Sequence, residues 1–290
     1  MKKTIIIFAG LAALALFGCN KQDVRTTESN ELTLTVSVPG KATKVTSTSF
    51  ENGDQISLFA VEYDGEEALP LQIGGNYLNN EKVTYNGTKW VGEETLYWSA
   101  KPCDFYALYP YQDFTSIDGQ IVDLALDQNV PGAYEASDIL YAKAINVSRA
   151  DGSVNLHFGH MMAKCVVNVI KGSNYEGEFP EDITAHVYNT VTSAKVNMIS
   201  GGIEKYAYGE HRTITMRKLN QQKYEAIVIP QNVERRTPLI EITMDGIAYL
   251  LESSVSFKPG YINIFNVTVN TSPTQEKLEI SIDASIDDWD

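Results

Sequence analysis

The chain has 290 residues, of which 37 are acidic and 23 are basic, so its net charge is −14 at pH 7. A surface with this excess of carboxylates repels phosphate backbones and anionic lipid headgroups, which argues against nucleic-acid binding. Hydrophobic residues make up 43% of the chain, enough for the cores of two ordinary domains or one large β domain.

The first 18 residues have the organisation of a secretory signal peptide. Lys2 and Lys3 precede an uncharged apolar run over residues 4–16, which is short for a membrane-spanning helix. The run is followed by a Leu-Phe-Gly-Cys sequence that ends at Cys19 and resembles a bacterial lipobox. We therefore expect cleavage before Cys19 and acylation of Cys19, for example with palmitate, which would tether the mature chain to a membrane.

The residues after the predicted cut indicate where the mature chain is tethered. Asn20 stands where an aspartate would resemble an inner-membrane retention signal, so the outer membrane is the favoured location. Residues 19–30 are polar and are predicted to form a flexible spacer between the lipid and the folded chain. Without Lys2 and Lys3 the mature chain keeps 21 basic against 37 acidic residues, so the lipid, and not a basic patch, is the expected membrane contact.

Residues 31–38 form the first predicted strand. Leu32, Leu34, Val36 and Val38 are apolar and alternate with polar residues, the pattern of a strand with one face buried.

The rest of the chain is also predicted to be all-β, since its apolar runs are short, rich in β-branched and aromatic residues, and bounded by Gly, Asn, Asp or Pro. The number of runs fits two β-sandwiches of about seven strands each, over residues 31–162 and 163–290. In the first half strands are predicted at residues 55–60, 96–98, 103–109, 120–126, 154–158 and 164–170. In the second half they are predicted at residues 183–189, 213–216, 224–229, 239–244, 247–251 and 262–269.

The last predicted strand and two turns complete the pattern. The apolar residues of this strand, which alternate with polar ones, are Leu278, Ile280, Ile282, Ala284 and Ile286. Asn-Gly at residues 86–87 and Asp-Gly at residues 245–246 are predicted to be two-residue hairpin turns, because both positions of each pair tolerate positive φ.

Cys103 and Cys165 are the cysteines that remain once Cys19 is committed to lipid. An exported chain with an even pair of cysteines permits a disulfide, but each also lies in an apolar strand-like context where a small buried side chain fits. The sequence leaves both alternatives open.

A search for catalytic or metal-binding patterns finds little. His157 and His160 lie near Cys165, but in a strand the two histidines face opposite ways and no third ligand has a supporting spacing. No nucleophile elbow is present, and the acidic pairs are adjacent residues that would face apart. We therefore expect no enzyme activity, no metal and no cofactor, and a periplasmic hydrolase has no motif in its favour.

Aromatic residues are concentrated in one region of the first half. Such residues are favoured in strands and most simply belong to a core, but exposed rings also bind sugars. A surface glycan-binding lipoprotein is therefore an alternative function. The residues concerned are Trp90, Trp98, Tyr106, Tyr109 and Tyr111.

Several short segments together resemble the fimbrillin family of Bacteroidales, in order and in approximate spacing from residue 50 to about residue 170. The closing sequence IDDW at residues 286–289 is also similar to a common ending in that family. The other segments are FENGDQISLFA (50–60), VTYNGTKW (83–90), LYW (96–98), DFYALYPY (104–111), SDILYA (137–142) and FGHMMAKCVV (158–167).

The resemblance implies a lipoprotein precursor of a type V pilus with two transthyretin-like (Greek-key) β-sandwich domains, acting as a stalk, tip or anchor subunit. It also implies that subunits join by donor-strand exchange, with other pilus subunits as partners and with a host or bacterial surface ligand left open. In this interpretation the strand carrying Leu32, Leu34, Val36 and Val38 is removable, and the strand over residues 278–286 is a donor or closing strand.

The basic residues near the first strand bear on how the chain would be processed. In family members that assemble into stalks the cut follows an arginine after the first strand, but this chain has no arginine between Arg25 and Arg149. Lys41 and Lys44 stand in the linker after the strand, whereas a cut at Arg25 would free the lipid and keep the strand. The pattern favours retention at the membrane and an accessory, tip or anchor role.

Overall fold

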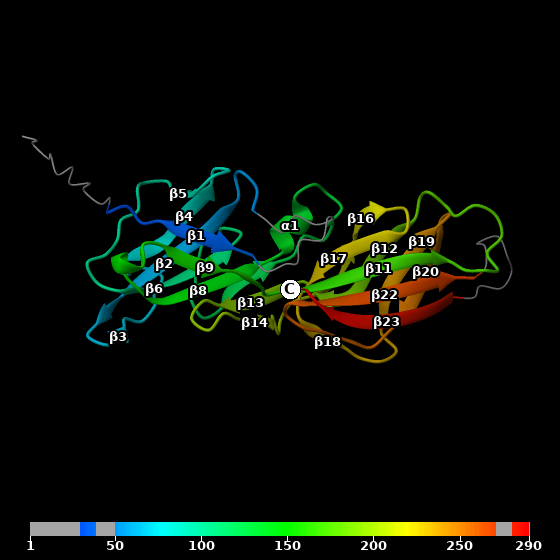
Figure 1. The fold of residues 1–290 in the computed structure, drawn as a ribbon. Coiled ribbons are helices and arrows are strands. Elements are labelled where there is room, and N and C mark those ends of the chain that lie inside the picture. The colour runs from blue at the N-terminus through cyan, green and yellow to red at the C-terminus, as the bar shows by residue number, and fades with distance from the viewer. Residues whose placement is uncertain (1–29, 39–49, 271–279, 290) are drawn as a thin grey trace, which may run out of the picture.

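The structure is a computed structural model that describes residues 30–38, 50–270 and 280–289. Strands dominate it, so the all-β prediction is confirmed. Figure 1 shows two groups of strands lying end to end, with the C-terminus at their junction. The predicted signal peptide, Cys19, Arg25, Lys41, Lys44 and Leu278 lie outside the described residues.

The first group is built on an antiparallel sheet with the order β10-β8-β6-β2-β4-β5, and β3 pairs with β2. β2 and β6 lie at its centre, where both faces are covered, and β2 is buried without interruption from Ile56 to Val61. The strands are β2 (Gln55–Asp64), β3 (Glu67–Ala68), β4 (Leu78–Tyr85), β5 (Trp90–Gly92), β6 (Cys103–Tyr109), β8 (Leu140–Val147) and β10 (Gly159–His160).

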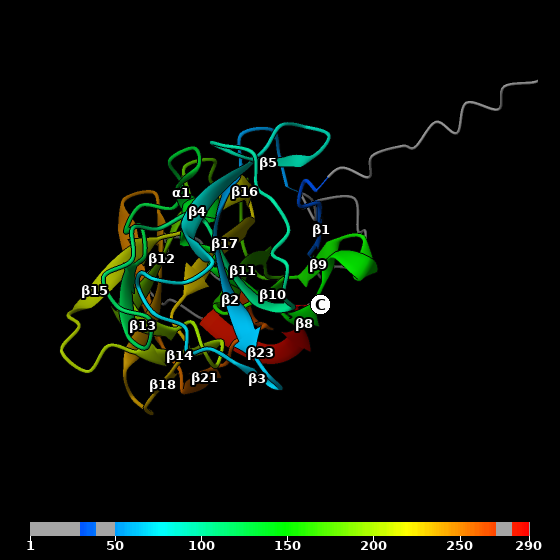
Figure 2. The same ribbon diagram turned by 90° about the vertical axis from the view of Figure 1, so that its left-hand side faces the viewer.

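Different elements cover the two faces of this sheet. On one face, Leu58 and Phe105 belong to a hydrophobic cluster that also contains residues of β9 (Val154–His157), which pairs in parallel with β1 (Leu34–Ser37). Figure 2 shows β1 beside β9. On the other face, Phe59 and Leu108 belong to a second cluster with residues of a three-stranded sheet. That sheet has the order β14-β13-β7 and comprises β7 (Gln120–Asp123), β13 (Ser193–Asn197) and β14 (Gly202–Lys205).

The second group contains a five-stranded sheet, a four-stranded sheet and one strand pair. The five-stranded sheet has the order β16-β17-β11-β22-β23, with β16 (Arg217–Asn220), β17 (Lys223–Val228), β11 (Ala163–Lys171), β22 (Tyr261–Val269) and β23 (Ile280–Asp288). The four-stranded sheet has the order β15-β12-β19-β20, with β15 (His211–Thr215), β12 (Thr184–Val191), β19 (Pro238–Met244) and β20 (Ile247–Glu252). The pair comprises β18 (Gln231–Val233) and β21 (Val255–Phe257). Two short helices lie earlier in the chain, α1 (Ala133–Ser137) before β8 and η1 (Arg149–Asp151) after it.

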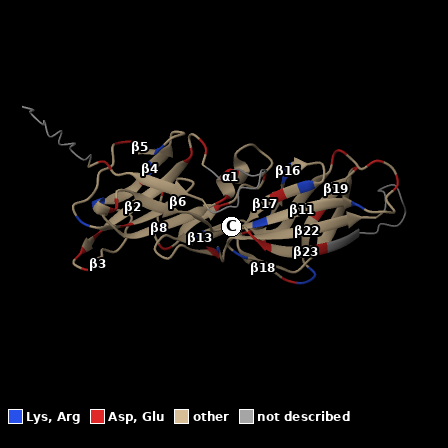
Figure 3. Cartoon of the chain, viewed as in Figure 1, with Lys and Arg blue, Asp and Glu red and all other residues tan. Residues whose placement is uncertain are grey.

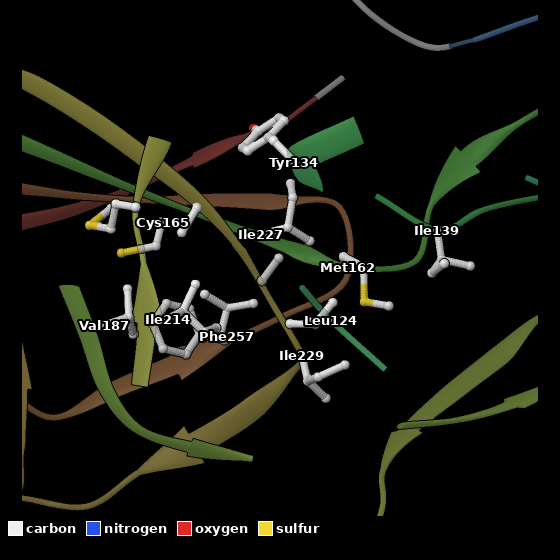
Figure 4. Packing of buried hydrophobic residues seen from close by; sticks show 14 of the residues in the cluster. Leu124, Tyr134, Ile139, Met162, Cys165, Val187, Ile214, Ile227, Ile229 and Phe257 are labelled. Carbon is white, nitrogen blue, oxygen red and sulfur yellow. The ribbon is translucent and has the colours of Figure 1, made fainter. Parts of the chain in front are cut away.

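One hydrophobic core crosses the junction between the two groups. Leu124 and Ile139 from the first half of the chain lie in the same cluster as Ile229 and Phe257 from the second half (Figure 4). The β13–β14 hairpin follows β12 in sequence but pairs with β7, so the chain crosses between the groups here. The division into domains 31–162 and 163–290 stays a prediction.

The two predicted hairpin turns have different outcomes. Asp245 and Gly246 form the predicted two-residue turn, with φ of 48° and 74°, between β19 and β20. The prediction for residues 86–87 is wrong, because β4 ends at Tyr85 and β5 begins only at Trp90. The Asn86 Oδ1 atom accepts a hydrogen bond from the backbone N–H of Lys89 at 2.9 Å, and this side-chain bond stabilises a wider connection.

Gly201, in the turn between β13 and β14, offers a test of how this hairpin packs on β8. Its φ is +68°, and a Cβ atom there would lie 2.4 Å from the ring of Tyr141. Gly65 has φ +67° with open space around it, so Gly65→Ala isolates the backbone strain. We expect Gly201→Ala to lower the free energy of unfolding by about 1–3 kcal/mol more than Gly65→Ala does in urea denaturation. Equal losses would contradict the close packing of Tyr141 on this turn.

Candidate functional site

The N-terminal described segment, residues 30–38, docks as an added strand on the first group. The backbone N–H of Leu32 donates to the carbonyl of Leu96 at 2.8 Å, and that of Val154 donates to the carbonyl of Thr33 at 2.8 Å. β1 then continues in parallel register with β9, from Leu34 opposite Val154 to Ser37 opposite His157. Backbone pairing on both flanks therefore holds the segment in place.

The side chains of this segment complete a hydrophobic core. Leu32 is only 7% exposed, and Leu34, Val36 and Val38 are half-buried against the cluster that contains Leu58 and Phe105. The intervening polar residues are exposed, so the alternation seen in the sequence matches the structure. Removing the segment would uncover an apolar groove beside β9.

β23 forms the edge of the five-stranded sheet on the other side of the junction. It pairs antiparallel with β22 over nine positions, with Ala284 opposite Phe265 and Ile286 opposite Asn263. Opposite residues share a face of the sheet, yet Phe265 and Asn263 are buried while Ala284 is exposed and Ile286 is 57% exposed. The edge strand therefore presents apolar side chains to solvent beside the core.

A buried group of charges lies where the two groups of strands meet. Lys164 of β11 bonds Glu225 of β17 with an Nζ–Oε2 distance of 2.8 Å, and Arg217 of β16 donates from Nε to the Oε1 atom of Glu225 at 3.0 Å. Arg217 also pairs with Glu135 of α1. Figure 3 shows Lys, Arg, Asp and Glu positions near this junction.

Glu225 is the centre of this network, with only 2% of its side chain exposed. Burial raises the pKa of the Glu225 carboxyl, but Lys164 and Arg217 outweigh burial and hold the pKa below its usual range. The carboxylate is therefore charged and compensates two cations at once.

The C-terminal residues pack against the same network. The Trp289 ring stacks on His160 of β10, with centroids 3.8 Å apart and planes at 7°, and the Lys164 ammonium lies 5.6 Å from the Trp289 ring centroid. The His160 Nδ1 atom lies 3.0 Å from the Oδ1 atom of Asp138. The sequence pattern indicates that His160 is a structural histidine. It does not associate His160 with Trp289, which lies 129 positions later in the chain.

A cavity of about 770 Å³ opens at this junction. Its lining includes Asp54, Tyr109 and Tyr111 from the first group, Tyr134 of α1, and Trp289. The Tyr134 hydroxyl is buried and has no hydrogen-bond partner within the part of the chain that the structure describes, and Figure 4 shows the ring of this α1 residue. The sequence did not assign a role to Tyr134.

Comparison with known proteins identifies the family. A family model described as fimbrillin-like matches residues 43–289. This chain belongs to the fimbrillin-like family. The resemblance seen in the short segments is thereby confirmed, and the family is one of structural fimbrial and adhesion proteins, not of enzymes. Membership implies a location at the cell surface or in a pilus.

Individual relatives support this assignment. A curated Bacteroides ovatus protein that bears the name fimbrium tip subunit Fim1C is 30% identical over an alignment of 198 positions, and the match covers 58% of this chain. The match spans only 36% of the length of that relative.

Solved structures share the fold of this fimbrillin-like chain. A structure described as a cell adhesion protein from Bacteroides uniformis aligns with a TM-score of 0.69 and 21% identity, covering 90% of this chain and all of the other. One from Bacteroides ovatus aligns with a TM-score of 0.66 and 16% identity, covering 89% of this chain and 97% of the other. At these identities the likeness concerns the fold.

The aromatic residues singled out in the sequence separate into two sets in this fimbrillin-like chain. Trp98 and Tyr106 are buried in the cores, and Trp90 is half-buried. Tyr109 and Tyr111 are half-buried and line the cavity at the junction. Trp90 is half-buried like these two tyrosines, but it does not line the junction cavity.

The cysteines and histidines have structural surroundings. Cys103 and Cys165 are free and buried, each in a different hydrophobic cluster, and burial raises the pKa of Cys103 to about 11. His157 is exposed, and its Nδ1 atom lies 2.6 Å from the Ser37 hydroxyl. Within residues 30–38, 50–270 and 280–289, the structure brings together no cluster of three His, Cys, Asp or Glu side chains suited to a metal ion. In the same ranges no helix is both long enough and apolar enough to cross a membrane.

Proposed function

We propose that this chain is a subunit of a type V pilus that joins partner subunits by donor-strand exchange. The observation that carries the proposal is the docking of residues 30–38, which close a hydrophobic core through four apolar side chains and pair with β9. A strand held only by its alternating side chains and its backbone can be replaced by an equivalent strand from a neighbour.

The edge strand β23 supplies a second element of this proposal. Its exposed Ala284 and Ile286 lie on the edge strand of the five-stranded sheet. A strand with apolar residues at alternate positions and, among the described residues, no paired neighbour on one side is suited either to close its own sheet or to pair with another chain. Residues 278–286 are therefore proposed as the donor or closing strand.

We place this subunit at the outer membrane, held through an acylated Cys19. A cut at Lys41 or Lys44 would remove both lipid and first strand, whereas a cut at Arg25 would remove the lipid alone. The absence of an arginine in residues 26–148 supports retention and hence an anchor or tip role. Other pilus subunits are the proposed partners.

The strand-exchange proposal predicts that residues 30–38 can be replaced after a single cut. We would substitute residues 41–44 with a specific protease site, cleave the folded chain, and add excess fluorescent peptide of sequence 30–38. The peptide is expected to displace the cut segment and comigrate with the protein in size-exclusion chromatography, because noncovalent contacts alone then hold the segment.

A peptide with Val36→Asp is the matched control, since a carboxylate cannot replace a half-buried valine without losing its hydration. It should not bind. Failure of the unmodified peptide to exchange, with the cut segment still retained, would exclude displacement at this strand and leave a permanently anchored subunit.

A surface glycan-binding lipoprotein is the second candidate function. Tyr109 and Tyr111, which line the junction cavity, favour it, whereas the buried Trp98 ring is not available to a ligand. Binding of the purified chain to a glycan array tests this candidate, and no signal on any glycan would reject it.

A further inference from the structure

The junction cavity is lined mainly by residues outside the strand-exchange segment, with which it shares Val38. Its volume of about 770 Å³ lies within the range of small-molecule sites, roughly 300–1,000 Å³. We propose that this cavity binds a neutral saccharide, with Asp54, Tyr109, Tyr111 and Tyr134 as the contacting residues. The inference rests on the glycan-binding candidate and gives it a location and a ligand class.

The charges around the cavity favour a neutral ligand. Among the cations of its lining, Lys164 and Arg217 are already bonded to Glu225, and His160 lies against Asp138. An anionic ligand would have to compete with these carboxylates for the same cations.

A cationic ligand meets the opposite difficulty. The Arg217 guanidinium lies 3.7 Å from the ring centroid of Tyr134, and the Lys164 ammonium lies 5.8 Å from it. An aromatic ring in contact with two cations of the chain is a poor site for a third positive charge. The Tyr134 side of the cavity therefore suits an uncharged polar ligand better than a charged one.

The opposite wall has groups that suit sugar hydroxyls. The Asp54 carboxylate accepts hydrogen bonds from the Glu51 backbone N–H at 2.6 Å and from the Tyr109 hydroxyl at 3.2 Å, so its orientation is held. Each carboxylate oxygen has a further lone pair that can accept from a ligand hydroxyl. The rings of Tyr109 and Tyr111 provide apolar surface for the C–H groups of a sugar ring.

Tyr134 provides an independent observation. The residue is only 6% exposed, and its hydroxyl is buried without a hydrogen-bond partner among the described residues. Such a group is unfavourable in a folded protein unless something satisfies it. A saccharide hydroxyl in the cavity beside α1 would supply the missing partner once the groups that cover the Tyr134 hydroxyl move aside.

The test measures binding of the mature chain to five probes by isothermal titration calorimetry. Maltotriose, lactose and chitotriose represent neutral saccharides, sialyllactose an anionic one, and trilysine a cation. We expect binding of at least one neutral saccharide. Tyr134→Phe removes only the hydroxyl and is expected to weaken that binding by about 5- to 10-fold, and Asp54→Asn by about 10-fold or more.

Tyr208→Phe is the matched control, because Tyr208 is 85% exposed and lies outside the cavity lining, so its affinity should equal that of the wild type. Thermal melts of each variant report whether it is folded. Saccharide binding that both cavity variants leave unchanged would overturn the proposed site but keep the glycan-binding candidate. Binding of sialyllactose or trilysine alone would overturn the ligand class, and no binding to any probe would overturn the inference. The peptide-exchange experiment is independent of all these results.

Discussion

Glu225→Gln is expected to lower the free energy of unfolding by about 3–5 kcal/mol at pH 7. The substitution keeps the size of the side chain but removes the charge that compensates Lys164 and Arg217. Lys164 is nearly as buried as Glu225, so its ammonium would remain in the interior without a carboxylate. Urea denaturation followed by tryptophan fluorescence measures the loss.

The matched control is Glu210→Gln. Glu210 also pairs with an arginine, Arg212, but both side chains are largely exposed, so the expected change is within about 0.5 kcal/mol. A similar loss of unfolding free energy in both variants would contradict the view that the Glu225 network stabilises the fold because it is buried.

The same comparison has a defined pH dependence. The pKa of Glu225 is lower in the folded chain than its usual value of 4.5, so its contribution to stability is fully present above about pH 4.5 and is lost as the pH falls through the folded-state pKa. The stability difference between the wild type and Glu225→Gln should therefore be largest at neutral pH and decrease below about pH 4.5. If the stability difference between the two proteins grew on acidification, the pKa of Glu225 would be raised, not lowered, by folding.

Leu32→Asp is expected to detach residues 30–38 while the rest of the chain stays folded. Leu32 is the most buried residue of this segment, and a carboxylate in its place would lose its hydration. Replacing the leucine alone removes about 2–4 kcal/mol of packing. If the segment can leave as a unit, however, the loss of stability cannot exceed the free energy with which the segment docks.

Hydrogen exchange distinguishes detachment from global destabilisation. The amides of Val154 and Phe158 donate to the carbonyls of Thr33 and Ser37, so both should lose protection in Leu32→Asp. The amides of β22, which belong to the second group, should keep theirs. Thr35→Asp, at an exposed position of the same strand, is the control and should leave all of these amides protected. Loss of protection throughout the chain would mean that the segment is an integral part of one cooperative unit.

Local patterns in the sequence identify many strands but not their partners. The strand predicted at residues 103–109 has the same bounds as β6, because an apolar run buried on both faces is recognisable without its neighbours. The local pattern does not indicate β8, since Lys143 and Asn146 interrupt its apolar residues. Nothing local indicates that β13 leaves the second group to pair with β7.

The candidate sites also differ in whether the sequence alone identifies them. The alternation over residues 31–38 identifies the face that docks, and the ordered segments identify the family, because both depend on residues that are close together in the chain. The charged network and the junction cavity depend on residues far apart, such as Arg217 and Glu135, which are 82 positions apart.

The sequence by itself therefore determined the all-β class, the apolar face of the first strand and the family, since side-chain alternation and short motifs are local properties. Only the tertiary structure decided that β1 runs parallel to β9, that Ile286 faces solvent, and that Glu225 holds two cations beside a cavity. The physical reason is that burial and charge pairing depend on which distant strands become neighbours. Any two strands can form the same backbone hydrogen bonds, so no short stretch of residues specifies its partner.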